Sequence, residues 1–66
     1  MVMSKFIVVN HNNRAELIIN DYKFYFEHQD EIDQWCMNTF DYLPRQGMLM
    51  SFNSITDLEV FLLRWN

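Results

Sequence analysis

The most informative segment of the chain is Thr56-Asp57-Leu58-Glu59-Val60-Phe61-Leu62-Leu63-Arg64-Trp65-Asn66. A helical pattern of apolar residues continues here almost to the end of the chain, where Arg64 and Trp65 follow the apolar run. Free chain ends are normally polar and disordered, whereas this one is rich in large apolar side chains. We therefore expect the end of the chain to be docked, either in the core or in an interface.

Length and composition predict one domain that spans residues 1–66. Hydrophobic residues make up 50% of the chain and aromatic residues 17%. A domain of this size buries only about 60% of the surface that its unfolded chain exposes. Some apolar bulk should therefore stay outside, and exposed apolar patches on small proteins usually mark a partner surface. The composition predicts a homodimer or a tight contact with another protein.

The charge pattern argues against binding of nucleic acid. The net charge is −4, from nine acidic and five basic residues. Phosphate contacts supply much of the affinity for nucleic acid, and they need clustered cations. The cations of this chain are scattered, at Lys5, Arg14, Lys23, Arg45 and Arg64. The acidic residues Glu27, Asp30, Glu31 and Asp33 cluster only locally, which is typical of a solvated helix start rather than of a DNA mimic.

The single cysteine and the start of the chain bear on the compartment. Cys36 has no cysteine to pair with inside the chain, so a secreted disulfide framework is excluded and the cytosol fits best. The first residues lack a basic leader followed by a long apolar region, and Phe6–Val9 is too short to cross a bilayer. We expect neither export by a signal peptide nor insertion into a membrane.

The first half of the chain reads as strands. The β-branched run within Lys5–Asn10 predicts a buried strand, and the polar stretch Asn10–Asn13 predicts a reversal of the chain. Two further segments, Ala15–Ile19 and Tyr22–Phe26, flank Asn20-Asp21, a loop of the length that closes a hairpin. Pairing across this loop places Ile19 opposite Tyr22, Leu17 opposite Phe24 and Ala15 opposite Phe26 on one face. The other face of this predicted hairpin carries Glu16, Ile18, Lys23, Tyr25 and Glu27.

From Asp30 the apolar spacing becomes helical. One stripe of this predicted main helix carries Ile32, Trp35, Cys36 and Phe40. The first turn carries the carboxylates that the helix dipole favours at that end, namely Asp30, Glu31 and Asp33. Pro44 and Gly47 bracket the exit loop, after which the alternation of Met48–Phe52 predicts another strand.

A second helix is expected after this strand. Asn53 or Ser54 can cap it, and Asp57 stands three residues after Ser54 as in a weak capping box. We expect about two helical turns, since the apolar inner face is short. The last residues, Leu62–Trp65, then form either a short strand or a last helical turn.

Together these elements predict an α+β domain of the order β-β-β-α-β-α, with a possible short strand at the C-terminus. Both helices should lie on one face of a four- or five-stranded antiparallel sheet. A ferredoxin-like sandwich is the nearest named shape.

The sequence offers no pattern for catalysis or for metal binding. His11 and His28 do not recur with Cys36 at spacings that are typical of zinc sites. Cys36 lies on the apolar stripe with no nearby cation, which predicts a buried and inert thiol. The chain also lacks a Ser-His-Asp arrangement, a glycine-rich phosphate loop and a catalytic pair of carboxylates. We expect no enzyme activity, no cofactor and no metal.

What remains are aromatic and cationic side chains of the kind that dominate interface hot spots. The candidates for partner binding are Tyr22, Lys23, Tyr25, Tyr42, Arg45, Arg64 and Trp65. We expect the partner surface on the sheet face that bears Ile18, Lys23 and Tyr25 and on the loop Asp41–Arg45. Arg64, between apolar neighbours, is expected to stack or to cap a helix end rather than to bind an anion.

The second half of the chain also shows a motif, carried by Trp35-Cys36, Phe40, Phe52, Asp57, Phe61, Leu63, Arg64 and Trp65. In this motif the chain resembles small uncharacterised proteins of tailed bacteriophages. Leu58 stands where such proteins have Ala, and Leu62 where they have Lys, so this end is more apolar. The resemblance implies an origin and no activity.

Size, missing chemistry and this resemblance predict a phage accessory protein of the host cytoplasm that binds a host protein and inhibits a host enzyme or an antiphage defence system. Two alternatives stay open. One is a sponge for a small nucleotide signal, held by Arg14, Arg45 or Arg64 at a dimer seam. The other is a structural component of the virion or of its assembly.

Overall fold

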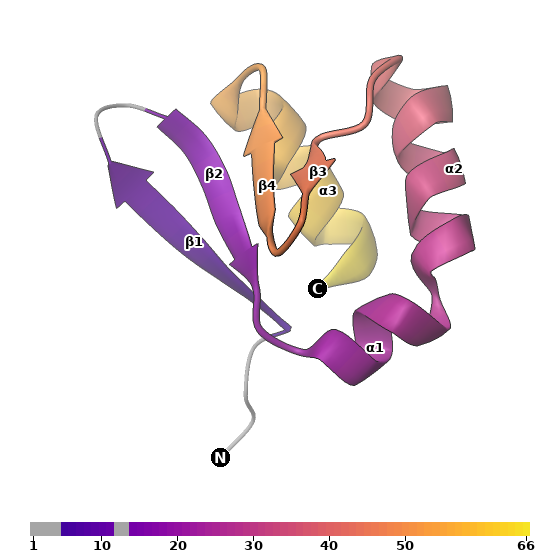
Figure 1. Cartoon of the computed structure of the whole chain (residues 1–66). Helices are drawn as coiled ribbons and strands as arrows, with labels where there is room; N and C mark the ends of the chain where they lie inside the picture. Colours follow the sequence, from indigo (N-terminus) through magenta and orange to yellow (C-terminus); the bar gives the residue numbers. More distant parts are fainter. Residues whose placement is uncertain (1–4, 12–13) are drawn as a thin grey trace.

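Figure 1 shows the computed structural model of the chain, which describes residues 5–11 and 14–66. The elements follow in the order β1 (Phe6–His11), β2 (Arg14–Ile19), α1 (Tyr22–Glu27), α2 (Gln29–Phe40), β3 (Arg45–Gln46), β4 (Leu49–Phe52) and α3 (Ile55–Trp65). The predicted α+β class is confirmed. The order of the elements differs from the predicted one and also from the β-α-β-β-α-β order of a ferredoxin-like sandwich.

The four strands form one antiparallel sheet in the order β1-β2-β4-β3. β1 pairs with β2 from Phe6 opposite Ile19 onwards, so the chain reverses between them as predicted. Asn12 and Asn13, which belong to the predicted reversal, lie outside the described residues. β3 and β4 form a second hairpin, whose turn contains Gly47 at φ 63°, a left-handed conformation that glycine adopts without strain.

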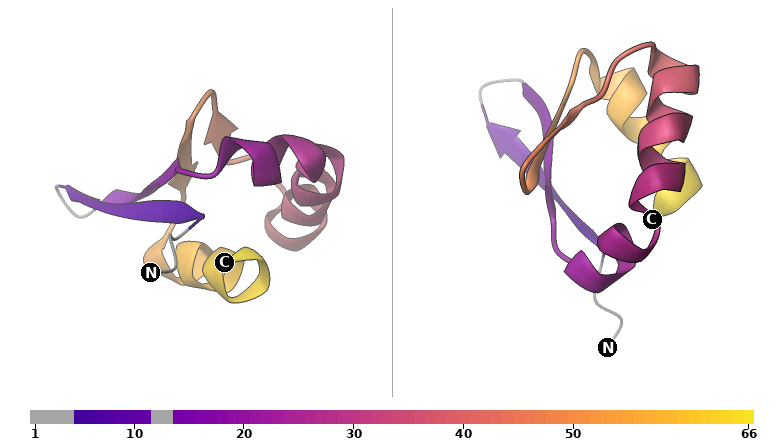
Figure 2. Two further views of the ribbon diagram at one scale, coloured as in Figure 1. Left: turned by 90° about the horizontal axis from the view of Figure 1, so that it is seen from below. Right: turned by 45° about the vertical axis from the view of Figure 1, so that its right-hand side comes forward.

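The helices cover one face of the sheet, as expected from the sequence (Figure 2). Alternate residues of the strands point to this face, so Leu17 of β2 and Met50 of β4 are fully buried. Their neighbours in the chain point the other way, and Ile18 is exposed there. The sheet is therefore apolar towards the helices and mixed towards solvent, as is usual for an antiparallel sheet with one covered face.

Phe61 of α3 is fully buried at the centre of the core. Its ring lies 5.1 Å from that of Phe6 on β1, 5.4 Å from that of Phe52 on β4 and 6.1 Å from that of Trp35 on α2. Trp65 is also buried, with its ring 6.1 Å from that of Trp35. The C-terminal end is therefore docked in the core, as predicted, but as the last turn of α3 and not as a strand.

The predicted strand at Tyr22–Phe26 is wrong, because this segment is α1. The carboxylate of Asp21 accepts a hydrogen bond from the backbone N–H of Phe24 at 3.0 Å, which caps the helix. The predicted hairpin also needs a free edge of β2, but β2 pairs with β1 on one side and with β4 on the other. A strand that follows β2 in the chain therefore has no free edge of β2 to pair with.

Candidate protein-binding surface

α1 presents two aromatic rings to solvent. Tyr22 and Phe26 are four residues apart and so share one side of the helix. Their rings stack with centroids 6.1 Å apart, and 49% of Tyr22 and 65% of Phe26 is exposed. Phe24, on the opposite side of the helix, packs against the core, and Tyr25 is buried. The helix thus has an inner face that packs on the core and an outer aromatic face without cover among the described residues.

A shallow hollow of about 300 Å³ lies beside the Phe26 ring, at the corner between α1 and α2. It is lined by Phe26, Glu27, His28, Gln29, Asp30 and Glu31. Asp30 and Glu31 lie in the first turn of α2, where the helix dipole stabilises carboxylates. His28 Nδ1 is 4.0 Å from Glu31 Oε1. The corner therefore joins an exposed ring to three exposed carboxylates, and we name Tyr22, Phe26, Glu27, Asp30 and Glu31 the α1 surface.

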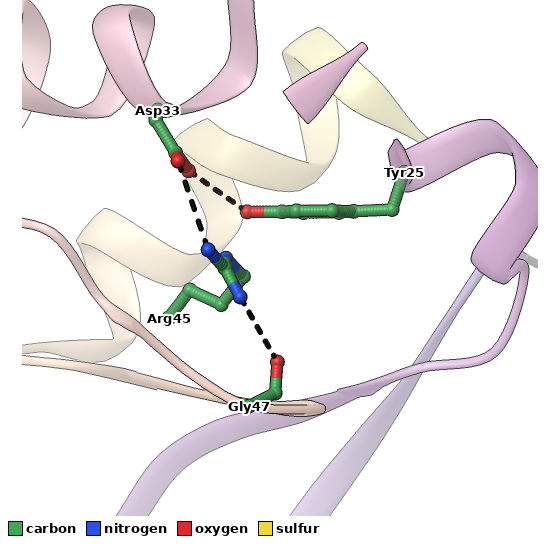
Figure 3. A network of polar contacts seen from close by, with 4 residues as sticks. All are labelled: Tyr25, Asp33, Arg45 and Gly47. Carbon is green, nitrogen blue, oxygen red and sulfur yellow. Dashed lines mark hydrogen bonds and ion pairs between the residues drawn. The ribbon is translucent and has the colours of Figure 1, made fainter. Parts of the chain in front are cut away.

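Tyr25, Asp33 and Arg45 form a polar contact inside the fold (Figure 3). The Tyr25 hydroxyl donates a hydrogen bond to Asp33 Oδ1 at 3.1 Å, and Arg45 Nη2 lies 3.8 Å from Asp33 Oδ2. The Arg45 guanidinium also lies 5.4 Å from the centre of the Tyr25 ring and donates to the carbonyl of Gly47 at 3.5 Å. Burial, then the neighbouring Asp33 carboxylate, raises the pKa of Tyr25. This group joins α1, α2 and β3.

The sheet face predicted to bear Ile18, Lys23 and Tyr25 does not form, because Lys23 and Tyr25 lie on α1. Ile18 lies on the open face of the sheet, whereas Lys23 and Tyr25 belong to a helix. Lys23 is exposed and Tyr25 is buried, so the three side chains do not share a surface. The cause is the change of period, because a helix turns successive residues by about 100° where a strand alternates them between two faces.

Tyr42, from the predicted loop Asp41–Arg45, is partly buried and ties this loop to α3. Its hydroxyl donates a hydrogen bond to Asp57 Oδ2 at 2.8 Å and accepts one from the backbone N–H of Asn53 at 2.9 Å. Burial and the Asp57 carboxylate raise the pKa of Tyr42, against the opposing effect of the Asn53 N–H. Tyr42 therefore holds the start of α3 in place.

Arg64 and Trp65 lie at the end of α3. The guanidinium of Arg64 stacks on the Trp65 ring at 4.0 Å, which confirms the predicted stacking. The Trp65 ring itself is buried against α2, while Arg64 is exposed. Of the predicted nucleotide-binding arginines, Arg14 lies on β2, Arg45 contacts Asp33 and Arg64 covers Trp65, so they occupy three separate elements.

The open face of the sheet carries a row of aliphatic side chains across β1, β2 and β4. Ile7 lies opposite Ile18, which lies opposite Leu49. One row further along the strands, Ser51 Oγ donates a hydrogen bond to Glu16 Oε2 at 2.9 Å. This face is therefore partly apolar and partly polar.

Cys36 is buried on α2, as predicted, and burial raises the pKa of its thiol to about 12, with a further contribution from Asp33. Within residues 5–11 and 14–66, no three His, Cys, Asp or Glu side chains are grouped as metal ligands. None of the helices in these same residues is both long and apolar enough to span a bilayer. A protonated, enclosed thiol is a poor nucleophile.

Among the predicted partner-binding residues, Tyr22, Lys23 and Arg64 are exposed, whereas Tyr25 and Trp65 belong to the core. The predicted hairpin places Phe26 on one face with Leu17 and Phe24, so the sequence does not identify it as a surface residue. Asp21, as a capping residue, is a local hint of a helix, and only in a helix does the spacing of Tyr22 and Phe26 give them a face from which Phe24 is absent. In comparison with known proteins, the chain matches no family model, no curated protein and no solved structure.

Proposed function

We propose that this chain is a small protein-binding module and that the α1 surface is its contact site. The observation that carries the proposal is the stacked pair of Tyr22 and Phe26. In this small domain, about half of the Tyr22 surface and more than half of the Phe26 surface is exposed to solvent. Aromatic side chains dominate binding hot spots. Because the two rings are already held against each other and against a helix, ordering them on binding costs little conformational entropy.

The charges next to the rings define the chemistry of the partner. Glu27, Asp30 and Glu31 line the hollow beside Phe26, and Lys23 is the one cation of α1. An arginine or lysine of a partner can lay its aliphatic stem on the Phe26 ring and bring its charge to these carboxylates. A basic surface with an apolar centre therefore complements this site. The net charge of −4 adds attraction over a longer range.

The biological role that this surface serves is that of a phage accessory protein that binds a host protein in the host cytoplasm and inhibits a host enzyme or an antiphage defence system. The support is the small size, the exposed aromatic pair and the resemblance of the second half of the chain to small phage proteins. Inhibition through a protein contact needs only a complementary surface. Such inhibition needs no reactive group, so it is compatible with the burial of the Cys36 thiol.

The test is an affinity capture from bacterial lysate with the tagged wild type and a Tyr22→Ser, Phe26→Ser double variant. The matched control is Met37→Ser, Leu43→Ser, which removes two side chains that are 44% and 51% exposed at other places on the surface. Circular dichroism checks that all three proteins are folded. We expect one basic protein that the wild type and the control retain and the double variant loses.

A second comparison tests the charges. Glu27→Gln, Asp30→Asn, Glu31→Gln should weaken binding of the same partner and should flatten the dependence of binding on salt, since charged contacts at a rim mainly steer association. Equal capture by wild type and by the Tyr22→Ser, Phe26→Ser variant rules out the α1 surface as the site. Absence of any partner that distinguishes the variants counts against the function itself.

A further inference from the structure

β1 forms one edge of the sheet, and its apolar residues Ile7 and Val8 are exposed to solvent. Among residues 5–11 and 14–66, β1 pairs with β2 on one side, and no other described strand lies along its outer side (Figures 1 and 2). From Phe6 to Val9 the strand contains neither a charge nor a proline. Proteins commonly guard an exposed edge with a lysine, a proline or a bulge, because an open edge is a template for another strand.

The pairing with β2 shows which backbone groups of this edge are free. The backbone N–H of Asn20 donates to the carbonyl of Lys5 at 2.9 Å, so the polar groups of Lys5 point towards β2. In an antiparallel pair, successive residues point their N–H and C=O groups alternately to the partner strand and away from it. Ile7 and Val9 therefore point towards β2, and Phe6, Val8 and Asn10 point outwards. The outward residues are symmetric about Val8.

The side chains of the edge are apolar on both faces of the sheet. Ile7 lies on the open face and is 48% exposed, and Val8 lies on the helix-covered face and is 44% exposed. Figure 2 shows that part of the β1–β2 hairpin projects beyond the helices. A strand that is added at this edge therefore buries apolar surface on both faces at once.

We propose that β1 pairs antiparallel with β1 of a second copy of this chain, across a two-fold axis at Val8. In this register Val8 lies opposite Val8 of the other copy, and Phe6 lies opposite Asn10 of the other copy. All the outward N–H and C=O groups of both strands then find a partner. The side chain of Ile7 comes next to that of Val9 of the other copy, and the two sheets join into one continuous sheet.

The occupant is a copy of the chain for two reasons. First, the free groups are self-complementary about Val8, and a two-fold contact uses the same patch on both subunits and closes on itself. Second, sites that bind a foreign peptide by strand addition rely on side-chain pockets beside the edge. Four hollows among the described residues are lined by β2, β4, the helices and their loops, and none of these four includes a residue of β1.

A contact through one pair of short strands is smaller than the interfaces of about 1,200–2,000 Å² that hold stable complexes. We therefore expect association that increases with concentration. The first test is the molar mass by sedimentation equilibrium over a range of concentrations, for the wild type, Val8→Pro and Val8→Lys. The Val8 N–H points outwards, so proline at this position leaves the β1–β2 hydrogen bonds in place and removes a donor from the edge. Lysine places two like charges on the axis.

The matched control is Met37→Lys, since Met37 on α2 is 44% exposed, as Val8 is. The wild type and this control should approach a doubled mass at high concentration, and both Val8 variants should stay monomeric. A wild type that is monomeric throughout the range overturns the proposal. So does a dimer that neither Val8 variant weakens.

Amide hydrogen exchange of the wild type decides the question even where a variant fails to fold. At low concentration the amides of Ile7 and Val9 should be protected, and those of Phe6, Val8 and Asn10 should exchange fast. At high concentration the second set should become protected as well. A dimer in which the amides of Phe6 and Val8 still exchange fast uses another surface, and it would refute the edge pairing.

Discussion

Tyr25 donates a hydrogen bond to Asp33 at 3.1 Å and thereby joins α1 to α2 at a point where the tyrosine ring is buried. Arg45 of β3 lies on the same carboxylate and over the same ring. The consecutive helices α1 and α2 and the strand β3 therefore meet at one carboxylate. This contact positions α1, and with it the exposed aromatic pair on its outer side.

Removal of the Tyr25 hydroxyl should loosen this junction. We expect Tyr25→Phe to lower the free energy of unfolding by about 1–2 kcal/mol, because a partly buried hydrogen bond to a charged group is lost while the packing of the ring is kept. Urea unfolding measures the change. Tyr22→Phe is the control, since it removes a hydroxyl from an exposed ring and should change the stability by less than about 0.5 kcal/mol. Equal effects of the two variants would contradict a specific role for the Tyr25 hydroxyl.

Stability should fall in alkaline solution because two buried groups resist ionisation. The pKa of Cys36 rises from 9.0 to about 12 by burial, and the pKa of Tyr25 rises from 10.0 by burial and by Asp33. The unfolded chain releases these protons first, so the stabilising contribution is complete below about pH 9 and is lost as the pH rises towards 12.

Chemical unfolding at a series of pH values tests this dependence. The free energy of unfolding of the wild type should decrease from about pH 9 upwards. The slope should be smaller in Cys36→Ala, which lacks the thiol, and smaller again when Tyr25→Phe is added. A wild-type stability that stays constant over this range would show that the two groups are accessible to solvent in the folded protein.

Tyr42 is expected to hold the start of α3 through its hydroxyl. Tyr42→Phe leaves the Asn53 N–H and the Asp57 carboxylate without this partner, so we expect a loss of about 1–2 kcal/mol of stability. Hydrogen exchange offers a local readout. The Asn53 amide should exchange faster in the variant, while the Ser51 amide, which donates to the carbonyl of Pro44, should not change. Equal acceleration at both amides would indicate general loosening instead.

The caps of α1 and α3 allow a comparison of two equivalent hydrogen bonds. Asp21 accepts from the Phe24 N–H at 3.0 Å, and Ser54 accepts from the Asp57 N–H at 3.1 Å. Replacement of either residue by alanine should cost about 1 kcal/mol of stability, and Asp21→Asn and Ser54→Asp, which keep a capping oxygen, should cost less. Thermal unfolding of the four variants measures this order. A stability of Asp21→Ala equal to that of the wild type would show that packing alone holds α1.

Several elements follow from local patterns of the sequence. The β-branched run after Lys5 is β1, and the alternation that places Met50 and Phe52 on one face is β4. The apolar stripe with Ile32 and Cys36 is α2. In each case, residues that are close in the sequence share a face, so the period of the pattern indicates the structure.

The segment Tyr22–Phe26 has no such period, because four aromatic residues and Lys23 suit a strand and a short helix equally. The same ambiguity governs the candidate surface. With the period of a strand, Phe26 shares a buried face with Phe24, and with the period of a helix it shares an exposed face with Tyr22. The predicted hairpin places Tyr22 and Phe26 on one face with Phe24, whereas both are exposed. The separate choice of Tyr22 as a candidate for partner binding agrees with its exposure.

The α+β class, most of the strand and helix positions and the burial of the C-terminal end can be predicted from the sequence, because these depend on contacts between near neighbours and on the hydrophobic effect. The position of β2 between β1 and β4 follows from long-range pairing in the folded chain. With both of its edges occupied, β2 cannot accept a third strand, and the next segment forms α1 instead. Strand pairing joins residues that are far apart in the chain, so no local pattern records it, and for this reason the surface of α1 becomes visible only in the folded protein.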